Sequence, residues 1–236
     1  MNDMQLLGGS LFAIALSTAA FVGGHFLLSH PLRATLVGRL GGGGFRGLYT
    51  VFALVAFVWM VNAHRTAPHV SLWGDPIWAR QLLAVWMLPV VLLFVVGMMT
   101  PSPAIVGGER KAFDVSGGLG VHAITRHPGL WGFALWALGH MIANGDAATV
   151  ILTGGIAVLA FGGMAGIDAR KSRDFPGTYG PFLAATSVVP FAAMAAGRTR
   201  FDFGKVGIGR LAVGLAVYVA MLFGHRWFVG LSALPL

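Results

Sequence analysis

The feature that most constrains this chain is a series of long apolar segments. A bilayer core of about 30 Å requires about 20 apolar residues per helix. Six segments reach or approach that length: residues 7–29, 46–63, 79–99, 128–144, 147–167 and 207–229. Charged residues make up only 10% of the chain, against about 25% in soluble domains. We therefore predict an all-α fold, a polytopic transmembrane helix bundle of about six helices forming a single domain over residues 1–236.

Three shorter stretches interrupt or connect these segments. Residues 181–197 are apolar but contain Pro190, so we expect a re-entrant or interfacial piece there. The glycine run at residues 41–44 has no following Lys-Ser/Thr and predicts a flexible turn before the second helix, with no phosphate loop. Asn144-Gly145-Asp146 is typical of a tight turn between helices.

The basic residues predict an orientation. All 16 except Arg65, Arg80 and Arg226 fall in or beside the loops that follow the first, third and fifth segments. Cytoplasmic loops collect Lys and Arg, so both termini are expected outside the cytoplasm. The same rule accounts for the net charge of +8 without a nucleic-acid partner. Residues 1–4 lack a positive n-region, so the first segment is expected to remain as a membrane helix.

Two histidines lie deep inside apolar segments and are candidate ligands. His25 follows Gly23 and Gly24 in the first segment, and His140 follows Gly139 in the fourth. The chain has no cysteine, which excludes thiolate ligands, and the surroundings lack the ligand spacing of a zinc or copper site. Two imidazoles on different helices suit a bis-histidine haem b. The alternative is that each histidine hydrogen-bonds across helices and binds nothing.

Arg126-His127-Pro128 opens the fourth segment. Arginine here is also explained by cytoplasmic positive charge, and proline is common in the first helical turn. His127 lies 13 residues before His140, or roughly 20 Å along a helix.

Three blocks of the chain resemble the NnrU family of bacterial inner-membrane proteins, to which 15-cis-zeta-carotene isomerase is related. They are GHFLLSHPLRATLVGRLG with RGLYTVFALVAF, then RHPGLWGFALWALGHMIANGD, then DARKSRDFPGTYGPFLAATSVVPF. The resemblance covers nearly the whole chain.

The resemblance implies a haem b held by two histidines, with His140 as one ligand and His25 as the other. Metal ligation is thus expected of His25 and His140, and a cofactor contact of His127 and Arg126. A first helix that begins near Leu11 leaves His25 and His140 offset by roughly 10 Å, which tilt can absorb. A start near Leu6 favours His127 as the partner of His25. The first block lacks the isomerase's His-Ser-Gly run, so carotene isomerisation is not carried over.

The resemblance also implies a link to denitrification, in the bacterial inner membrane, and to the nitrite and nitric oxide reductase machinery. Two further functions stay open. RHP with Asp174, Tyr179-Gly180 and Val189-Pro190 also resembles isoprenylcysteine carboxyl methyltransferases, which use S-adenosylmethionine, although the paired glutamates of that family are missing. The other alternative is a non-enzymatic membrane accessory factor. The sequence does not indicate an oligomeric state.

Overall fold

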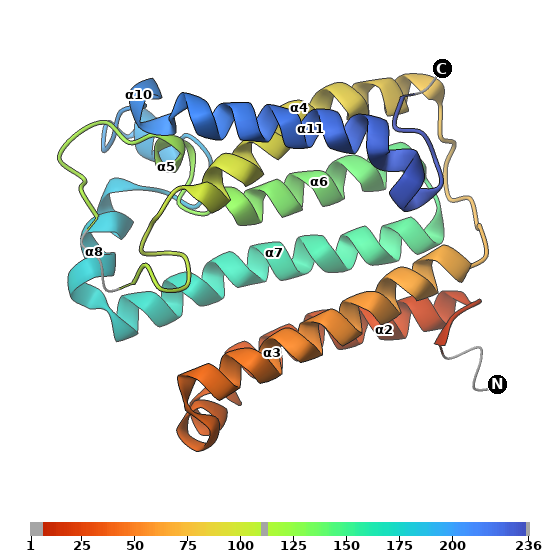
Figure 1. Ribbon diagram of the computed structural model, residues 1–236, viewed down its shortest axis with the longest axis horizontal. Helices are drawn as coiled ribbons and strands as arrows, with labels where there is room; N and C mark the ends of the chain where they lie inside the picture. Colours follow the sequence, from red (N-terminus) through yellow and green to blue (C-terminus); the bar gives the residue numbers. More distant parts are fainter. Residues whose placement is uncertain (1–6, 110–112, 235–236) are drawn as a thin grey trace. The chain divides into compact units, whose positions relative to one another are not determined.

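The computed structural model describes residues 7–109 and 113–234, and this part of the chain is helical and contains no β-strand (Figure 1). Residues 1–4, together with Arg110 and Lys111, lie outside it. Five of its helices are long and apolar enough to cross a membrane. These are α2 (Leu11–Ser29), α3 (Arg33–Thr66), α4 (Ile77–Met99), α7 (Ala147–Asp174) and α11 (Ile208–Val229). A sixth, α6 (Pro128–Asn144), has 17 residues. The prediction of an all-α, multi-pass membrane protein is confirmed.

Large apolar side chains cover the outer surface of these helices. On α3, Val51, Leu54, Val55 and Val58 are each about three-fifths exposed. A soluble monomer seldom exposes so continuous an apolar face. Lipid is the solvent that makes this face stable.

The glycine run near the start of α3 corrects one expectation from the sequence. Residues 41–44 do not form a flexible turn, because helix continues on both sides of a kink at Gly41, where φ is 67° and ψ is 169°. That backbone conformation is open to glycine, which lacks a Cβ. Residues 42–44 then resume the helix.

The apolar stretch at residues 181–197 forms no long helix. It comprises the end of α8 (Pro176–Ala185) and all of α9 (Ala192–Ala195), and irregular backbone joins the two. The stretch is thus short and interrupted, and its re-entrant or interfacial placement stays a prediction. The turn at residues 144–146 is confirmed, with Gly145 at φ 58° and the Asp146 carboxylate accepting from the Thr149 amide at 3.1 Å.

The chain divides into two compact units, and each draws on two stretches of sequence. The first comprises Met1–Pro76 and Ala137–Leu159, the second Ile77–Trp136 and Ala160–Leu236. Both α6 and α7 contribute to each unit. The expectation of a single domain over the whole chain stays a prediction.

In the first unit, α2 packs along α3 and the beginning of α7. Ser10 caps α2 by accepting from the Ala13 amide at 3.0 Å. The buried core joins Ile14 and Phe21 of α2 to Met60 of α3 and Ala148 of α7. The unit is therefore held mainly by apolar contacts.

In the second unit, α4 lies beside α11 (Figure 1) and α6. The Tyr218 hydroxyl of α11 donates to the Ala84 carbonyl at 3.0 Å. The Trp86 indole donates to the Leu135 carbonyl of α6 at 3.2 Å. These bonds satisfy polar groups in surroundings where water does not reach them.

Two adjacent glycines of α2 offer a matched test of helix packing. A Cβ on Gly24 would lie 1.9 Å from the Phe52 ring of α3, whereas one on Gly23 would meet no atom of residues 7–109 or 113–234 within 4 Å. We expect Gly24→Ala to lower the free energy of unfolding by about 1–3 kcal/mol through overpacking. Gly23→Ala should leave it unchanged or raise it by up to about 1 kcal/mol through helix propensity.

Thermal unfolding followed by circular dichroism in detergent measures both variants. Equal midpoints for the two would show that α2 does not pack on Phe52.

Candidate functional site

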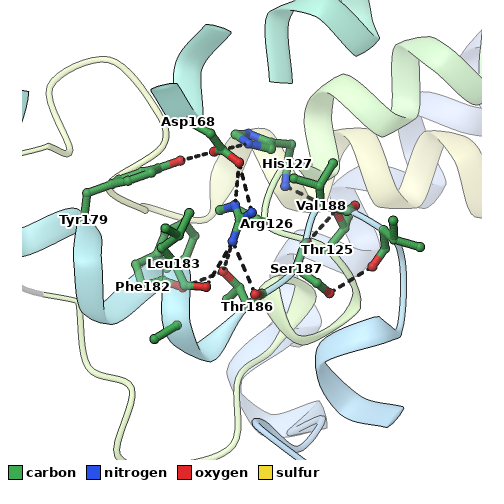
Figure 2. Close-up of polar contacts among 12 residues, drawn as sticks. Thr125, Arg126, His127, Asp168, Tyr179, Phe182, Leu183, Thr186, Ser187 and Val188 are labelled. Carbon is green, nitrogen blue, oxygen red and sulfur yellow. Dashed lines mark hydrogen bonds and ion pairs between the residues drawn. The ribbon is translucent and has the colours of Figure 1, made fainter. Parts of the chain in front are cut away.

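A polar cluster in the second unit forms around the junction between α5 (Val121–Ile124) and α6 (Figure 2). The backbone between α5 and α6 is extended at Thr125. It pairs with Ser187 and Val188, which follow α8. The Arg126 amide donates to the Ser187 carbonyl at 2.7 Å. The Thr125 hydroxyl and the Trp131 indole both donate to the Val188 carbonyl, each at 2.8 Å. These bonds fix the backbone that presents Arg126 and His127.

Three side chains share the carboxylate of Asp168 on α7 (Figure 2). The Arg126 guanidinium contacts Oδ2 through Nε at 3.0 Å and Nη2 at 2.9 Å. His127 Nε2 lies 2.7 Å from Oδ1, and the Tyr179 hydroxyl donates to the same oxygen at 2.5 Å. An ionised carboxylate only accepts hydrogen bonds, so His127 carries its proton on Nε2.

The other edge of the Arg126 guanidinium holds the end of α8. Its Nη1 donates to the Leu183 carbonyl and the Thr186 carbonyl, both at 3.2 Å, and to the Thr186 hydroxyl at 3.3 Å. The last carbonyls of a helix lack partners within it. Arg126 is only 7% exposed, so this buried cation links the partly buried Asp168 carboxylate to a helix C-terminus.

Tyr179 is fully buried at 0% exposure. Burial and the neighbouring Asp168 carboxylate raise the pKa of Tyr179 well above its usual value. The phenol therefore stays protonated and acts as a donor. Together with Arg126 and His127 it keeps a negative charge stable in a largely apolar environment.

A second buried cation on α7 fastens the loop that follows α4. Lys171 is 4% exposed, and its Nζ donates to the Pro103 and Ile105 carbonyls, each at 2.6 Å. Glu109 lies 3.4 Å from the same nitrogen. Asp168 and Lys171 lie three residues apart, so one end of α7 organises both connections.

The two deeply placed histidines lie in the first unit. His25 is half-buried, and its Nδ1 lies 2.7 Å from the Phe21 carbonyl oxygen. A carbonyl only accepts, so Nδ1 carries the proton and Nε2 presents a lone pair. Aromatic rings surround the imidazole: the centroids of Phe21, Tyr49 and Phe52 lie at 4.3, 5.3 and 6.2 Å. The Phe52 ring occupies the space beside Gly24, whereas no described atom lies within 4 Å of the Cβ position of Gly23.

His140 is half-buried on α6. A Cβ on Gly154 would lie 3.7 Å from its neighbour Met141, and a Cβ on Gly155 would lie 2.2 Å from Thr18 of α2. His140 is thus at about the same height as Thr18 along the axis of α2. His25 lies seven residues after Thr18 on that helix, or roughly 10 Å along its axis. Helix α2 begins at Leu11, which is the start that favours His140 as the partner of His25.

The structure therefore separates the four residues singled out in the sequence. His25 and His140 belong to the first unit, while Arg126 and His127 belong to the second. Their ligand and cofactor roles stay predictions. Sequence reasoning missed Asp168, although a signal was present: the chain has only eight acidic residues, and this one ends an apolar run where a lone carboxylate is costly.

The shared carboxylate predicts a large effect on stability. Asp168→Asn leaves Arg126 buried without its counter-charge, so we expect the free energy of unfolding to fall by about 3 kcal/mol or more. The control is Asp174→Asn, which removes an exposed partner of Arg173 and should cost less than about 1 kcal/mol. Thermal midpoints in detergent compare the two, and a midpoint for Asp168→Asn no lower than that of the control would contradict a structural role for this network.

Comparison with known proteins agrees with the motifs in the sequence. Residues 13–233 match the family described as NnrU protein. The chloroplastic 15-cis-zeta-carotene isomerase of Arabidopsis thaliana is 30% identical over 199 residues, which cover 80% of this chain and 52% of that protein. The chain thus spans about half the length of this curated relative. No solved structure matches the chain significantly. The family match extends from α2 to the end of the last long helix, and the chain belongs to the NnrU family.

Proposed function

We propose that this membrane protein binds a haem b through His25 and His140 and carries out redox-linked, isomerase-like chemistry on an apolar substrate. The observation that carries the proposal is the 2.7 Å contact between His25 Nδ1 and the Phe21 carbonyl. Metal-ligating histidines characteristically donate their second ring N–H to a carbonyl or carboxylate, which fixes the ring and raises the basicity of the ligating nitrogen.

Two further observations support a fit to haem. The His25 ring lies among Phe21, Tyr49 and Phe52, and such flat apolar rings suit a macrocycle between helices. His140 lies on another helix of the same compact unit. His127, in contrast, already has its Nε2 against Asp168, which favours His140 as the second ligand.

A bound haem would supply a redox-active iron whose potential depends on its axial ligands. The residues of the chain would hold and orient it: the Phe21 carbonyl sets the tautomer of His25, and apolar helices exclude water. The relative that matches is named for isomerising a 15-cis-carotene, which supports a cis double bond in an apolar molecule as the substrate class. Carotene itself is not included, because the block around His25 differs from that of the isomerase.

Within this proposal the protein works in a bacterial inner membrane with both termini in the periplasm, alongside the nitrite and nitric oxide reductase machinery. Support for the orientation comes from the basic residues. Arg170, Lys171 and Arg173 follow the apolar part of α7, and Lys205 and Arg210 lie at or before the beginning of α11. This end of the second unit has the charge expected of a cytoplasmic face.

The haem proposal predicts a spectrum. Protein purified from cells supplied with haem precursor should show a low-spin, six-coordinate b-type spectrum. His25→Ala and His140→Ala should each abolish the Soret band or convert it to a high-spin form, since each removes an axial ligand. His30→Ala is the matched control, because His30 is an exposed histidine at the end of α2.

A native spectrum in either ligand variant would remove that residue from the proposal. Loss of the spectrum in His127→Ala, with His140→Ala unaffected, would transfer the second ligand to His127. Haem-free protein would contradict the proposal and favour an accessory factor.

Methyl transfer is tested separately by calorimetry with S-adenosylmethionine. His127 and Tyr179 both point at Asp168, so their polar atoms are engaged within the protein. We expect no saturable heat of binding. Saturable binding that is lost in His127→Ala would establish the methyltransferase alternative.

A further inference from the structure

A small pocket in the second unit lies between the end of α4 and the beginning of α11. Its volume is about 260 Å³. Phe113 and Leu119 line it from the loop after α4, His122 from α5, and Lys205 and Arg210 from α10 (Phe203–Val206) and α11. The pocket combines an apolar wall with two cationic side chains.

His122 is the unexplained member of this pocket. It is only 2% exposed, and neither ring nitrogen has a hydrogen-bond partner among residues 7–109 and 113–234. Phe113 and Phe182 pack edge-on against its ring, with centroids at 5.6 and 5.5 Å. A buried polar group without a partner is destabilising, so a ligand that supplies the missing hydrogen bond would recover that free energy.

The His122 ring is neutral at ordinary pH. Burial lowers the pKa of His122 to about 4, and the nearby backbone of Thr100 and Thr125 opposes this to a smaller extent without forming a hydrogen bond of good geometry. A neutral imidazole has one N–H donor and one acceptor nitrogen. The ring can therefore donate one hydrogen bond to an oxygen in the pocket.

The two cations at the rim are available to an anion. Lys205 Nζ lies 3.6 Å from the Asp114 carboxylate, with side chains 42% and 68% exposed, and such exposed pairs contribute little. Arg210 Nη1 donates to the Lys205 and Val206 carbonyls, both at 3.2 Å, which orients the guanidinium. Two positive charges face one negative charge, so the pocket has an excess of positive charge.

We propose that this pocket binds a phosphate group, either on the headgroup of an anionic lipid or as free phosphate. Phosphate oxygens accept from guanidinium, ammonium and imidazole N–H groups. The pocket adjoins the ends of two apolar helices, and basic pockets at such positions bind lipid headgroups. Phe113 and Leu119 then contact the apolar part of the lipid. This assignment is independent of the haem.

Two probes distinguish the sources. The full-length protein is reconstituted in nanodiscs of phosphatidylcholine with or without phosphatidylglycerol, and retained lipid is counted by native mass spectrometry. Inorganic phosphate is titrated separately and followed by ³¹P NMR. Saturable retention of one phosphatidylglycerol per chain supports a lipid headgroup. Saturable phosphate binding without lipid retention supports the site with a soluble ligand.

Three variants assign the binding to the pocket. His122→Phe preserves the ring packing and removes the nitrogens. The affinity for the phosphate ligand should therefore fall about fivefold, which corresponds to the loss of one hydrogen bond. Lys205→Gln should lower it about tenfold or more through loss of a charge-assisted bond. The control, Arg173→Gln, removes an exposed charge outside the pocket and should leave affinity unchanged.

Thermal unfolding separates this role from a structural one. Without ligand, His122→Phe should be at least as stable as the wild type, because it removes two unsatisfied polar atoms. The proposal is overturned if neither probe binds, or if Arg173→Gln weakens binding as much as the pocket variants do.

Discussion

The second unit depends on one partly buried carboxylate, Asp168, whose side chain is 17% exposed. Asp168 carries a negative charge into an apolar region, where an unpaired ion is strongly destabilising. Arg126, His127 and Tyr179 surround it at 2.5–3.0 Å. Asp168 lies on α7, Tyr179 lies on α8, and Arg126 and His127 lie at the α5–α6 junction. Compensating the charge therefore also brings three parts of the chain together.

The same arginine shows how polar groups are matched where water is scarce. Arg126 pairs with Asp168 on one edge and accommodates the Leu183 and Thr186 carbonyls on the other. Lys171 does the same for the Pro103 and Ile105 carbonyls. Irregular backbone at this end of the unit is thus stabilised by buried cations, in place of the hydrogen bonds of a continuous helix.

The first unit is organised differently, by apolar packing around α2. Phe52 occupies the space left by Gly24, and the Phe21 carbonyl orients the neighbouring imidazole of His25. Rigid surroundings of this kind are what a cofactor ligand needs. The bond to the Phe21 carbonyl and three aromatic neighbours also hold the His25 ring in one orientation.

The number and length of the apolar segments by themselves determined that this protein is a multi-pass helical protein, because a membrane leaves the backbone few alternatives. Turn residues likewise located the connection at Gly145. Only the tertiary structure decided that Arg126, which positive-inside charge also explains, is buried against Asp168, 42 residues away. It also decided that α2 begins at Leu11 and that the His122 ring has no hydrogen-bond partner within the described part of the chain. Hydropathy reports the solvent around a segment, whereas pairings between distant residues depend on how helices pack, which no local pattern encodes.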